Sequence, residues 1–371
     1  IRDRGTCGVM GTASTMAITT EALGLMIPNS ACAPAVSADR KRIAESTGKT
    51  AVKIAMENLK PSDYLSEKNF LNALIVLSSI GGSTNGLVHL TAMAGRLGIT
   101  IDLIKFDEIT KNLPMIVDLK PSGTGYMEDL YKAGGSQRIF YELKDFLYLD
   151  AKSVNGTTLG EEIKNSAKWT QNIITDKSNP VFNAGSIAVL KGTLAPNSAI
   201  IKQSAATESL LIHEGRAVVF EGLEDLANRI DRDDLDVTKD DVLVLKSIGP
   251  KGGPGMPEAG LIPIPKKLAK QGVKDMVRIS DGRMSGTASG TIILHVTPES
   301  YENGPLAIVE NGDLIKLDVP KRKIDLMISE EEIAERLLKR KELSIRRRGY
   351  NKIYMEHVTQ ADRGVDFDFL I

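Results

Sequence analysis

Short apolar runs separated by turn residues dominate the second half of the chain. Runs of β-branched and aliphatic residues between Gly, Asn, Asp and Pro have the length of buried strands. Helical spacing interrupts this pattern at residues 223–230 and 264–271. Together these patterns predict a mostly β, barrel-like domain over residues 177–371, which ends with a helix and a tail. We expect its strands at residues 186–190, 199–202, 217–220, 241–245, 276–279, 291–296, 306–309 and 314–319.

Residues 1–176 have a different pattern, in which apolar positions recur with the spacing of a helix. This spacing predicts helices at residues 11–25, 39–58, 87–97 and 127–133. Residues 70–80 are compatible with a helix or a strand, and residues 99–106 with a short strand or a turn. Helices between short apolar runs predict a layered α/β domain. The fold class is therefore α/β, with a layered α/β domain before a mostly β, barrel-like domain.

Composition excludes several classes of protein. The chain is 42% hydrophobic and 26% charged, as in soluble globular proteins. Its length of 371 residues predicts two or three domains. A net charge of -1 and 5% aromatic residues argue against nucleic acid and anionic membranes as partners. The chain has no apolar stretch of the roughly 18 residues that a membrane span requires. Its two cysteines, Cys7 and Cys32, exclude a disulfide scaffold and fit a reducing cytosol, so we expect a cytoplasmic protein.

The beginning of the chain resembles the middle of a loop. It starts at Ile1 without an initiator methionine and reaches a glycine-rich element at once. We therefore expect that the native protein continues upstream and that this chain is its C-terminal part.

Two loops rich in small polar residues carry the candidate chemistry. Residues 280–290 combine a carboxylate, a guanidinium, four hydroxyls and three glycines between two apolar runs. Residues 249–258 form a second loop of glycine and proline with one lysine, one methionine and one glutamate. Such loops let a small polar ligand approach the backbone closely. Their proximity in sequence predicts that they belong to one active site.

At these residues the chain resembles a dehydratase family that contains dihydroxy-acid, phosphogluconate and sugar-acid (aldonate) dehydratases. Residues 280–286, Ser-Asp-Gly-Arg-Met-Ser-Gly, resemble the C-terminal signature of that family, and residues 249–258 its second active-site loop. Residues 6–16 resemble the family segment that carries the third cysteine ligand of an iron-sulfur cluster. Residues 81–85 and 133–135 also resemble segments of that family. The motifs occur in the expected order over nearly the whole chain.

The resemblance implies an activity and its cofactors. Family members remove water from a 2,3-dihydroxy carboxylate and give a 2-keto-3-deoxy acid. They use a [2Fe-2S] cluster and Mg²⁺, and we expect a homodimer or homotetramer. Residues 10–16 and 357–364 resemble the aldonate dehydratases more than the enzyme of branched-chain amino-acid synthesis. A sugar acid such as arabinonate, xylonate or gluconate is therefore the expected substrate, with a dihydroxy acid as the alternative.

The resemblance also assigns roles to three residues, each of which has a simpler interpretation. Ser285 is the expected base, acting as an alkoxide, although a serine there can also cap a turn. Glu258 is the expected magnesium ligand, although most glutamates are solvated surface residues. Cys7 is the expected cluster ligand, although a lone cysteine is more often a buried thiol.

Further residues are candidates for substrate contacts. Arg283 and Thr287 are expected at the substrate carboxylate or hydroxyls, and His357 is expected to reach the substrate from the C-terminal tail. A surface position is an equal alternative for His357. Asp281 fits a turn-fixing role as well as a substrate contact.

The chain departs from the family in one respect. Two further cluster cysteines and most magnesium ligands of the family lie upstream of the segment around Cys7, and Cys32 does not replace them. We therefore expect this chain alone to be inactive, and a non-catalytic paralogue is a competing hypothesis. A phosphate cradle is a third, but neither loop has the P-loop pattern.

Overall fold

The computed structural model describes residues 7–164, 166, 171–340 and 348–371. The chain forms two compact units. Unit 1 comprises Ile1–Leu90, Leu97–Thr100 and Lys105–Ser186, and unit 2 comprises Thr91–Arg96, Ile101–Ile104 and Ile187–Ile371. The change in sequence pattern predicts a boundary after residue 176.

Helices make up the regular structure in the described part of the first half of the chain. They are α1 (Thr12–Ala22), α2 (Ala38–Glu57), α3 (Glu67–Ser79), α4 (Asn85–Gly95), α5 (Leu103–Thr110), α6 (Met127–Lys132), α7 (Gly135–Glu142) and α8 (Leu159–Ile163), with the 3-10 turn η1 (Pro61–Asp63). Isolated β-bridges, such as Met115 with Phe182, connect the loops between them. The segment expected as a short strand or turn at residues 99–106 leads into α5.

A buried carboxylate holds part of unit 1 together. Glu21, near the end of α1, accepts hydrogen bonds from the backbone N–H of Asn29 (2.6 Å) and Ala31 (2.9 Å). It also accepts from Ser136 Oγ and Gln137 Nε2, both at 2.8 Å. Burial raises the pKa of Glu21, while these donors oppose the shift. Glu21 therefore ties α1 to the following loop and to α7.

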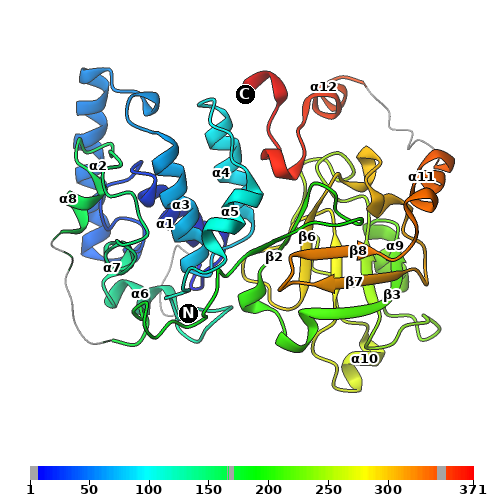
Figure 1. Cartoon of the computed structure of the whole chain (residues 1–371). Coiled ribbons are helices and arrows are strands. Elements are labelled where there is room, and N and C mark those ends of the chain that lie inside the picture. Colours follow the sequence, from blue (N-terminus) through cyan, green and yellow to red (C-terminus); the bar gives the residue numbers. More distant parts are fainter. Residues whose placement is uncertain (1–6, 165, 167–170, 341–347) are drawn as a thin grey trace. The chain divides into compact units, whose positions relative to one another are not determined.

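Unit 2 contains a nearly closed, barrel-shaped sheet of eight strands (Figure 1). The spatial order is β1-β2-β6-β5-β4-β3-β7-β8. A bridge between Lys191 and Lys323 links the two outer strands. This sheet confirms the predicted fold class. The strands are β1 (Ala188–Leu190), β2 (Ser198–Ile201), β3 (Ile212–Phe220), β4 (Val242–Leu245), β5 (Arg278–Ser280), β6 (Ile292–Thr297), β7 (Leu314–Asp318) and β8 (Lys323–Leu326).

The four central strands, β6, β5, β4 and β3, run parallel to one another. Their side chains alternate between the barrel interior and an outer face. Val244 and Ile279 belong to the interior core, whereas Leu243 and Leu245 pack outward against α9 and α10. Both faces are thus buried, which explains why the sequences of these strands are continuous apolar runs.

Short helices and the tail complete unit 2. The α-helices are α9 (Leu223–Arg229), α10 (Lys266–Lys270), α11 (Glu330–Lys339) and α12 (Tyr350–His357). The 3-10 turns are η2 (Gln203–Ala205), η3 (Glu208–Leu210), η4 (Ser300–Glu302), η5 (Pro305–Ile308), η6 (Ala361–Arg363) and η7 (Asp368–Leu370). In the described residues, no helix combines the length and apolar character of a membrane span.

Two strand predictions were wrong in unit 2. Residues 306–309 were expected as a strand but lie largely in η5, because Pro305 at its first position favours a helical turn. β8 was not expected, since its residues alternate between exposed Lys323 and buried Ile324 rather than forming an apolar run.

Candidate functional site

The two glycine-rich loops begin side by side at one edge of the sheet. β4 and β5 are parallel, and Leu245 is in register with Ser280. The loop after β4 leads to residues 249–258, and the loop after β5 covers residues 281–290. Ligands of parallel sheets commonly bind beyond the carboxyl ends of the strands. The topology therefore brings together the loops that sequence analysis assigned to one site.

Asp281 connects the beginnings of these loops. Its carboxylate accepts hydrogen bonds from the backbone N–H of Ile248 (3.0 Å) and Ser247 (3.3 Å). It also accepts from the N–H (2.9 Å) and hydroxyl (2.6 Å) of Ser300, which follows β6. The side chain is fully buried, and burial raises its pKa against these hydrogen bonds. Of its two expected roles, the structure supports fixing the turn.

Arg283 connects the loop after β5 to the second half of the loop after β4. Its Nε donates to the carbonyl oxygen of Met256, and its own carbonyl accepts from the N–H of Gly260 (2.8 Å). These bonds position the segment that contains Glu258, whose side chain is exposed. Arg283 therefore has a structural contact in unit 2, and its contact with a substrate stays a prediction.

Ser285 and Thr287 lie at the outer part of the loop. Their hydroxyls share a hydrogen bond of 2.9 Å, and the Thr287 N–H lies 3.4 Å from Ser285 Oγ. Ser285 is half-buried and Thr287 is exposed, while Met284 and Ala288 are buried against β6. The apolar neighbours anchor the loop and leave the two hydroxyls together at its surface.

Gly290, at the end of this loop, has a backbone conformation and surroundings that favour glycine. Its φ of +118° is rarely adopted by other residues, and a Cβ there would lie 2.0 Å from the guanidinium of Arg278. Arg278 is buried and paired with Asp275 at 2.6 Å. A larger residue at this position would therefore displace a buried ion pair.

A second buried carboxylate, Glu299, supports the glycine-rich loop after β4. It accepts hydrogen bonds from the backbone N–H of Lys251 (2.9 Å) and Gly252 (2.9 Å) and from Gln360 Nε2 (2.7 Å). Burial, aided by the negative charge of Asp281, raises the pKa of Glu299 to about 7 although the hydrogen bonds oppose this. The loop thus rests on a carboxyl group that titrates near neutral pH.

Replacement of Glu299 with glutamine is expected to change how stability depends on pH. The folded pKa lies above the ordinary value of 4.5, so the folded state holds a proton that the unfolded state has lost between about pH 4.5 and 7. The free energy of unfolding of the wild type should fall across this window relative to Glu299→Gln, by up to about 1.4 kcal/mol per pH unit.

Urea unfolding of both proteins at pH 5, 6, 7 and 8 measures this difference. The loss of one hydrogen-bond acceptor lowers the free energy of unfolding of the variant by the same amount at every pH. Only the change with pH of the difference between the two proteins therefore reports the titration of Glu299. Parallel pH profiles for the two proteins would contradict the assigned role of Glu299.

The C-terminal tail is fastened to the same loop. The hydroxyl of Tyr354 donates to the carbonyl of Pro250 (2.9 Å) and accepts from the N–H of Gly255 (2.8 Å). His357, at the end of α12, instead places Nδ1 2.9 Å from Asp368 Oδ1. Its contact with a substrate therefore stays a prediction, while Tyr354 holds the loop directly.

The cysteines differ in their surroundings. Cys7 is exposed, at the beginning of the described residues of unit 1. Cys32 is buried near Glu21, and burial together with that neighbour raises the pKa of its thiol to about 12. A thiol that stays protonated is a poor metal ligand. This agrees with the expectation that Cys32 does not replace a cluster cysteine.

The described residues do not form a complete site for either expected cofactor. They contain no group of three or more His, Cys, Asp or Glu side chains that could hold a metal ion. A [2Fe-2S] cluster is held by several protein ligands, and protein-bound Mg²⁺ requires an octahedral set of oxygens. Cys7 and Glu258 each supply a single donor, so their roles as ligands stay predictions.

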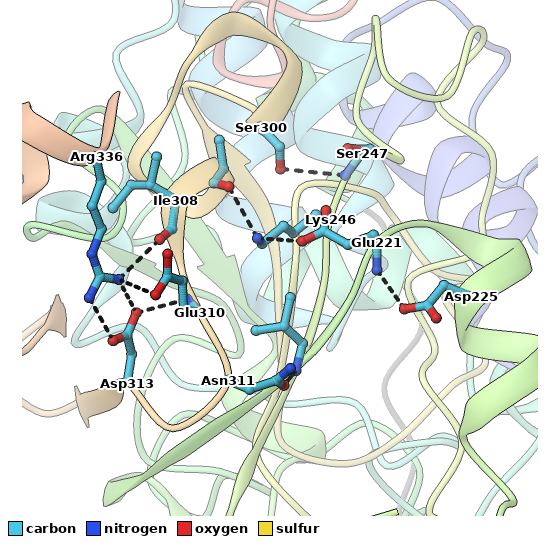
Figure 2. Close-up of polar contacts among 12 residues, drawn as sticks. Glu221, Asp225, Lys246, Ser247, Ser300, Ile308, Glu310, Asn311, Asp313 and Arg336 are labelled. Carbon is cyan, nitrogen blue, oxygen red and sulfur yellow. Dashed lines mark hydrogen bonds and ion pairs between the residues drawn. The ribbon is translucent and has the colours of Figure 1, made fainter. Parts of the chain in front are cut away.

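A separate hollow of about 480 Å³ lies beside the ends of β3 and β4 (Figure 2). Its basic side chains are Arg229, Lys246, Arg336, Lys339 and Arg340. Each has an acceptor within the chain. The pairs are Arg229 with Asp225, Lys246 with Glu221 (2.7 Å), Arg336 with Asp313 (2.6 Å), Lys339 with Glu335, and Arg340 with Asn303. The positive charges of the hollow thus already have acceptors in the described part of the chain.

The residues that support the loops were not predicted from the sequence. Glu299, Tyr354 and Gln360 are far from the glycine-rich segments in sequence, and their contacts depend on strand order and on the path of the tail. One signal was present for Glu299, which follows the apolar run of β6 closely, as Asp281 follows that of β5. Carboxylates after two parallel strands would have predicted a shared edge.

Comparison with known families extends over most of the chain. The C-terminal domain of dihydroxy-acid and 6-phosphogluconate dehydratases matches residues 172–365. The N-terminal domain of the same enzymes matches residues 1–162. These matches confirm the resemblance found in the motifs.

Individual relatives agree with this result. An L-arabinonate dehydratase of Rhizobium leguminosarum is 45% identical over 372 residues, which cover 100% of this chain and 64% of the relative. An L-arabonate dehydratase of Azospirillum brasilense is 44% identical over 361 residues, covering 95% and 62%. A dihydroxy-acid dehydratase of Methanococcoides burtonii is 40% identical over 365 residues, covering 97% and 65%.

The chain thus spans somewhat less than two thirds of the relatives it matches, while up to 100% of the chain itself aligns. The expectation that this chain alone is inactive is not borne out by these comparisons.

Proposed function

The chain belongs to the dihydroxy-acid and 6-phosphogluconate dehydratase family, and from this premise we propose that it is a hydro-lyase acting on a sugar acid. The proposed reaction removes water from a 2,3-dihydroxy carboxylate and gives a 2-keto-3-deoxy acid. The observation that carries the proposal is the hydroxyl pair of Ser285 and Thr287, held 2.9 Å apart on a loop that Asp281 and Arg283 fix at the carboxyl edge of the parallel strands.

Ser285 is proposed as the base that removes the proton from C2. A serine hydroxyl requires stabilisation of its alkoxide for this role. The hydroxyl and N–H of Thr287 are donors close to Ser285 Oγ and support that stabilisation. Hydroxide leaves C3 and takes the proton that Ser285 has received from C2, which gives water and restores the alkoxide. The enol that remains tautomerises to the 2-keto acid.

The cofactors and the assembly are part of the same proposal. A [2Fe-2S] cluster and Mg²⁺ are proposed with Cys7 and Glu258 as one donor each, and no step is assigned to either group. The proposed enzyme is a homodimer or homotetramer whose partner in the reaction is a small sugar acid.

A dihydroxy-acid dehydratase is the second candidate. Relatives with that name are 38–40% identical to the chain, compared with 44–45% for the two arabinonate enzymes. The higher identity supports the aldonate as substrate.

A single assay tests both candidates. Purified protein is incubated with L-arabinonate, D-gluconate or 2,3-dihydroxy-3-methylbutanoate, and the 2-keto acid formed is quantified with semicarbazide. We expect a higher kcat/KM for an aldonate. A preference for the branched dihydroxy acid would favour the second candidate, and no keto acid from any of the three would reject a hydro-lyase.

A further inference from the structure

Lys202, which directly follows β2, is a buried lysine. Its exposed fraction is 2%. Its Nζ makes no hydrogen bond with any residue that the structure describes. Buried polar groups in proteins are nearly always hydrogen-bonded, and buried ammonium groups are usually paired. The basic residues of the hollow in Figure 2 follow this rule, and Lys202 does not.

The strand register places Lys202 on the face that the Ser285 loop covers. β2 is antiparallel to β6, with Ile200 opposite Leu294 and Ile201 opposite Ile293. Ile201 and Ile293 belong to the barrel interior, so Lys202, one residue further, shares the outer face with Ile200. On that face, Met284 and Ala288 pack against Ile292 and Leu294. Lys202 therefore lies on the same side of the sheet as the loop's anchors.

The chain after Lys202 is also attached to the end of that loop. The carbonyl oxygen of Ala205 accepts from the N–H of Gly290 (2.8 Å). The N–H of Thr207 donates to the hydroxyl of Thr291 (3.1 Å). The sheet register and these bonds thus place the chain around Lys202 beside the end of the loop that carries Ser285.

The charged groups on the surrounding elements have other contacts. Asp275 pairs with Arg278 and accepts from Thr207 and Thr291. Arg283 donates to a backbone carbonyl, and His295 is the buried titratable group of β6. Burial is the cause that lowers the pKa of Lys202 to about 7.

We propose that Lys202 binds the carboxylate of the ligand at the Ser285 loop. The inference rests on the proposed function, since it assigns a counter-ion to the same sugar acid. A buried amine without an acceptor gains both a charge partner and a hydrogen bond when an anionic oxygen arrives. The ligand class is a hydroxy carboxylate, and the neutral alditol of the same shape lacks the group that Lys202 would contact.

Proton uptake on binding distinguishes this role from a structural one. Free Lys202 is mostly neutral above pH 7, and a bound carboxylate favours the protonated form. Binding at pH 8 should therefore take up close to one proton, and Kd should rise about tenfold per pH unit above 7. Calorimetry in two cationic buffers with different ionisation enthalpies measures that proton.

The probe is a 3-deoxy aldonate, which has no C3 hydroxyl to lose and is not turned over. Lys202→Met should lose the proton uptake and the pH dependence of Kd. Lys191→Met, which changes an exposed lysine near the end of β1, should keep both. The 3-deoxy alditol should bind without proton uptake in every protein.

The outcomes separate this inference from the proposed function. Probe binding with proton uptake, but without turnover of any aldonate, would support Lys202 and reject the hydro-lyase. Turnover of an aldonate with no proton uptake on probe binding would reject the role of Lys202 alone. If Lys202→Met does not fold, the wild-type measurement alone decides: binding without proton uptake, or no binding, overturns the inference.

Discussion

Replacement of Ser285 with alanine is expected to lower kcat by about 10²–10⁴-fold, the usual contribution of a positioned acid or base. The variant keeps the loop in place because Met284 and Ala288 anchor it and the Ser285 carbonyl still accepts from the Ala288 N–H. The loss should therefore appear in kcat, with KM changed little. Initial rates of keto-acid formation from the preferred aldonate measure both parameters.

Thr287→Val is the matched control for this experiment. It removes the hydroxyl that shares a hydrogen bond with Ser285 Oγ but keeps the backbone N–H and the shape of the side chain. We expect a smaller loss than for Ser285→Ala. Activity of Ser285→Ala within a few fold of the wild type would eliminate Ser285 as the base.

Much of the fold could be predicted because burial determines the local pattern of apolar and polar residues. The strand Val242–Leu245 is apolar at every position, since one face meets the barrel interior and the other meets α9 and α10. β8 has one exposed face, and its alternation over four residues is too short to stand out. The parallel order of the central strands was not predicted, because it depends on contacts between distant segments.

The candidate site was predictable to the same extent. The glycine-rich loops are local features, and both were identified before their common edge was known. Asp281 allowed two interpretations, because a carboxylate in a turn has the same sequence signal whether it binds backbone or substrate. Lys202 gave no local signal, and the only signal for Glu299 was its place shortly after the apolar run of β6. What distinguishes both residues is the absence or presence of partners brought by other segments.

Replacement of Asp281 with alanine is expected to lower the free energy of unfolding of unit 2 by about 3–5 kcal/mol. The change leaves the backbone donors of Ser247, Ile248 and Ser300 without their acceptor, in a place that water does not reach. Each orphaned buried donor costs about 1–3 kcal/mol, although relaxation makes the sum smaller than the parts. Urea unfolding followed by circular dichroism measures the loss.

Asp281→Asn separates the two contributions of this carboxylate. The amide keeps one acceptor oxygen but places an NH₂ group at the other position, where it meets either the Ile248 N–H or the N–H groups of Ser247 and Ser300. We therefore expect a loss between those of the wild type and Asp281→Ala. Equal stability of Asp281→Ala and the wild type would mean that the loops do not depend on this residue. In that case the position of Ser285 would have to be maintained by Arg283 and the apolar anchors alone.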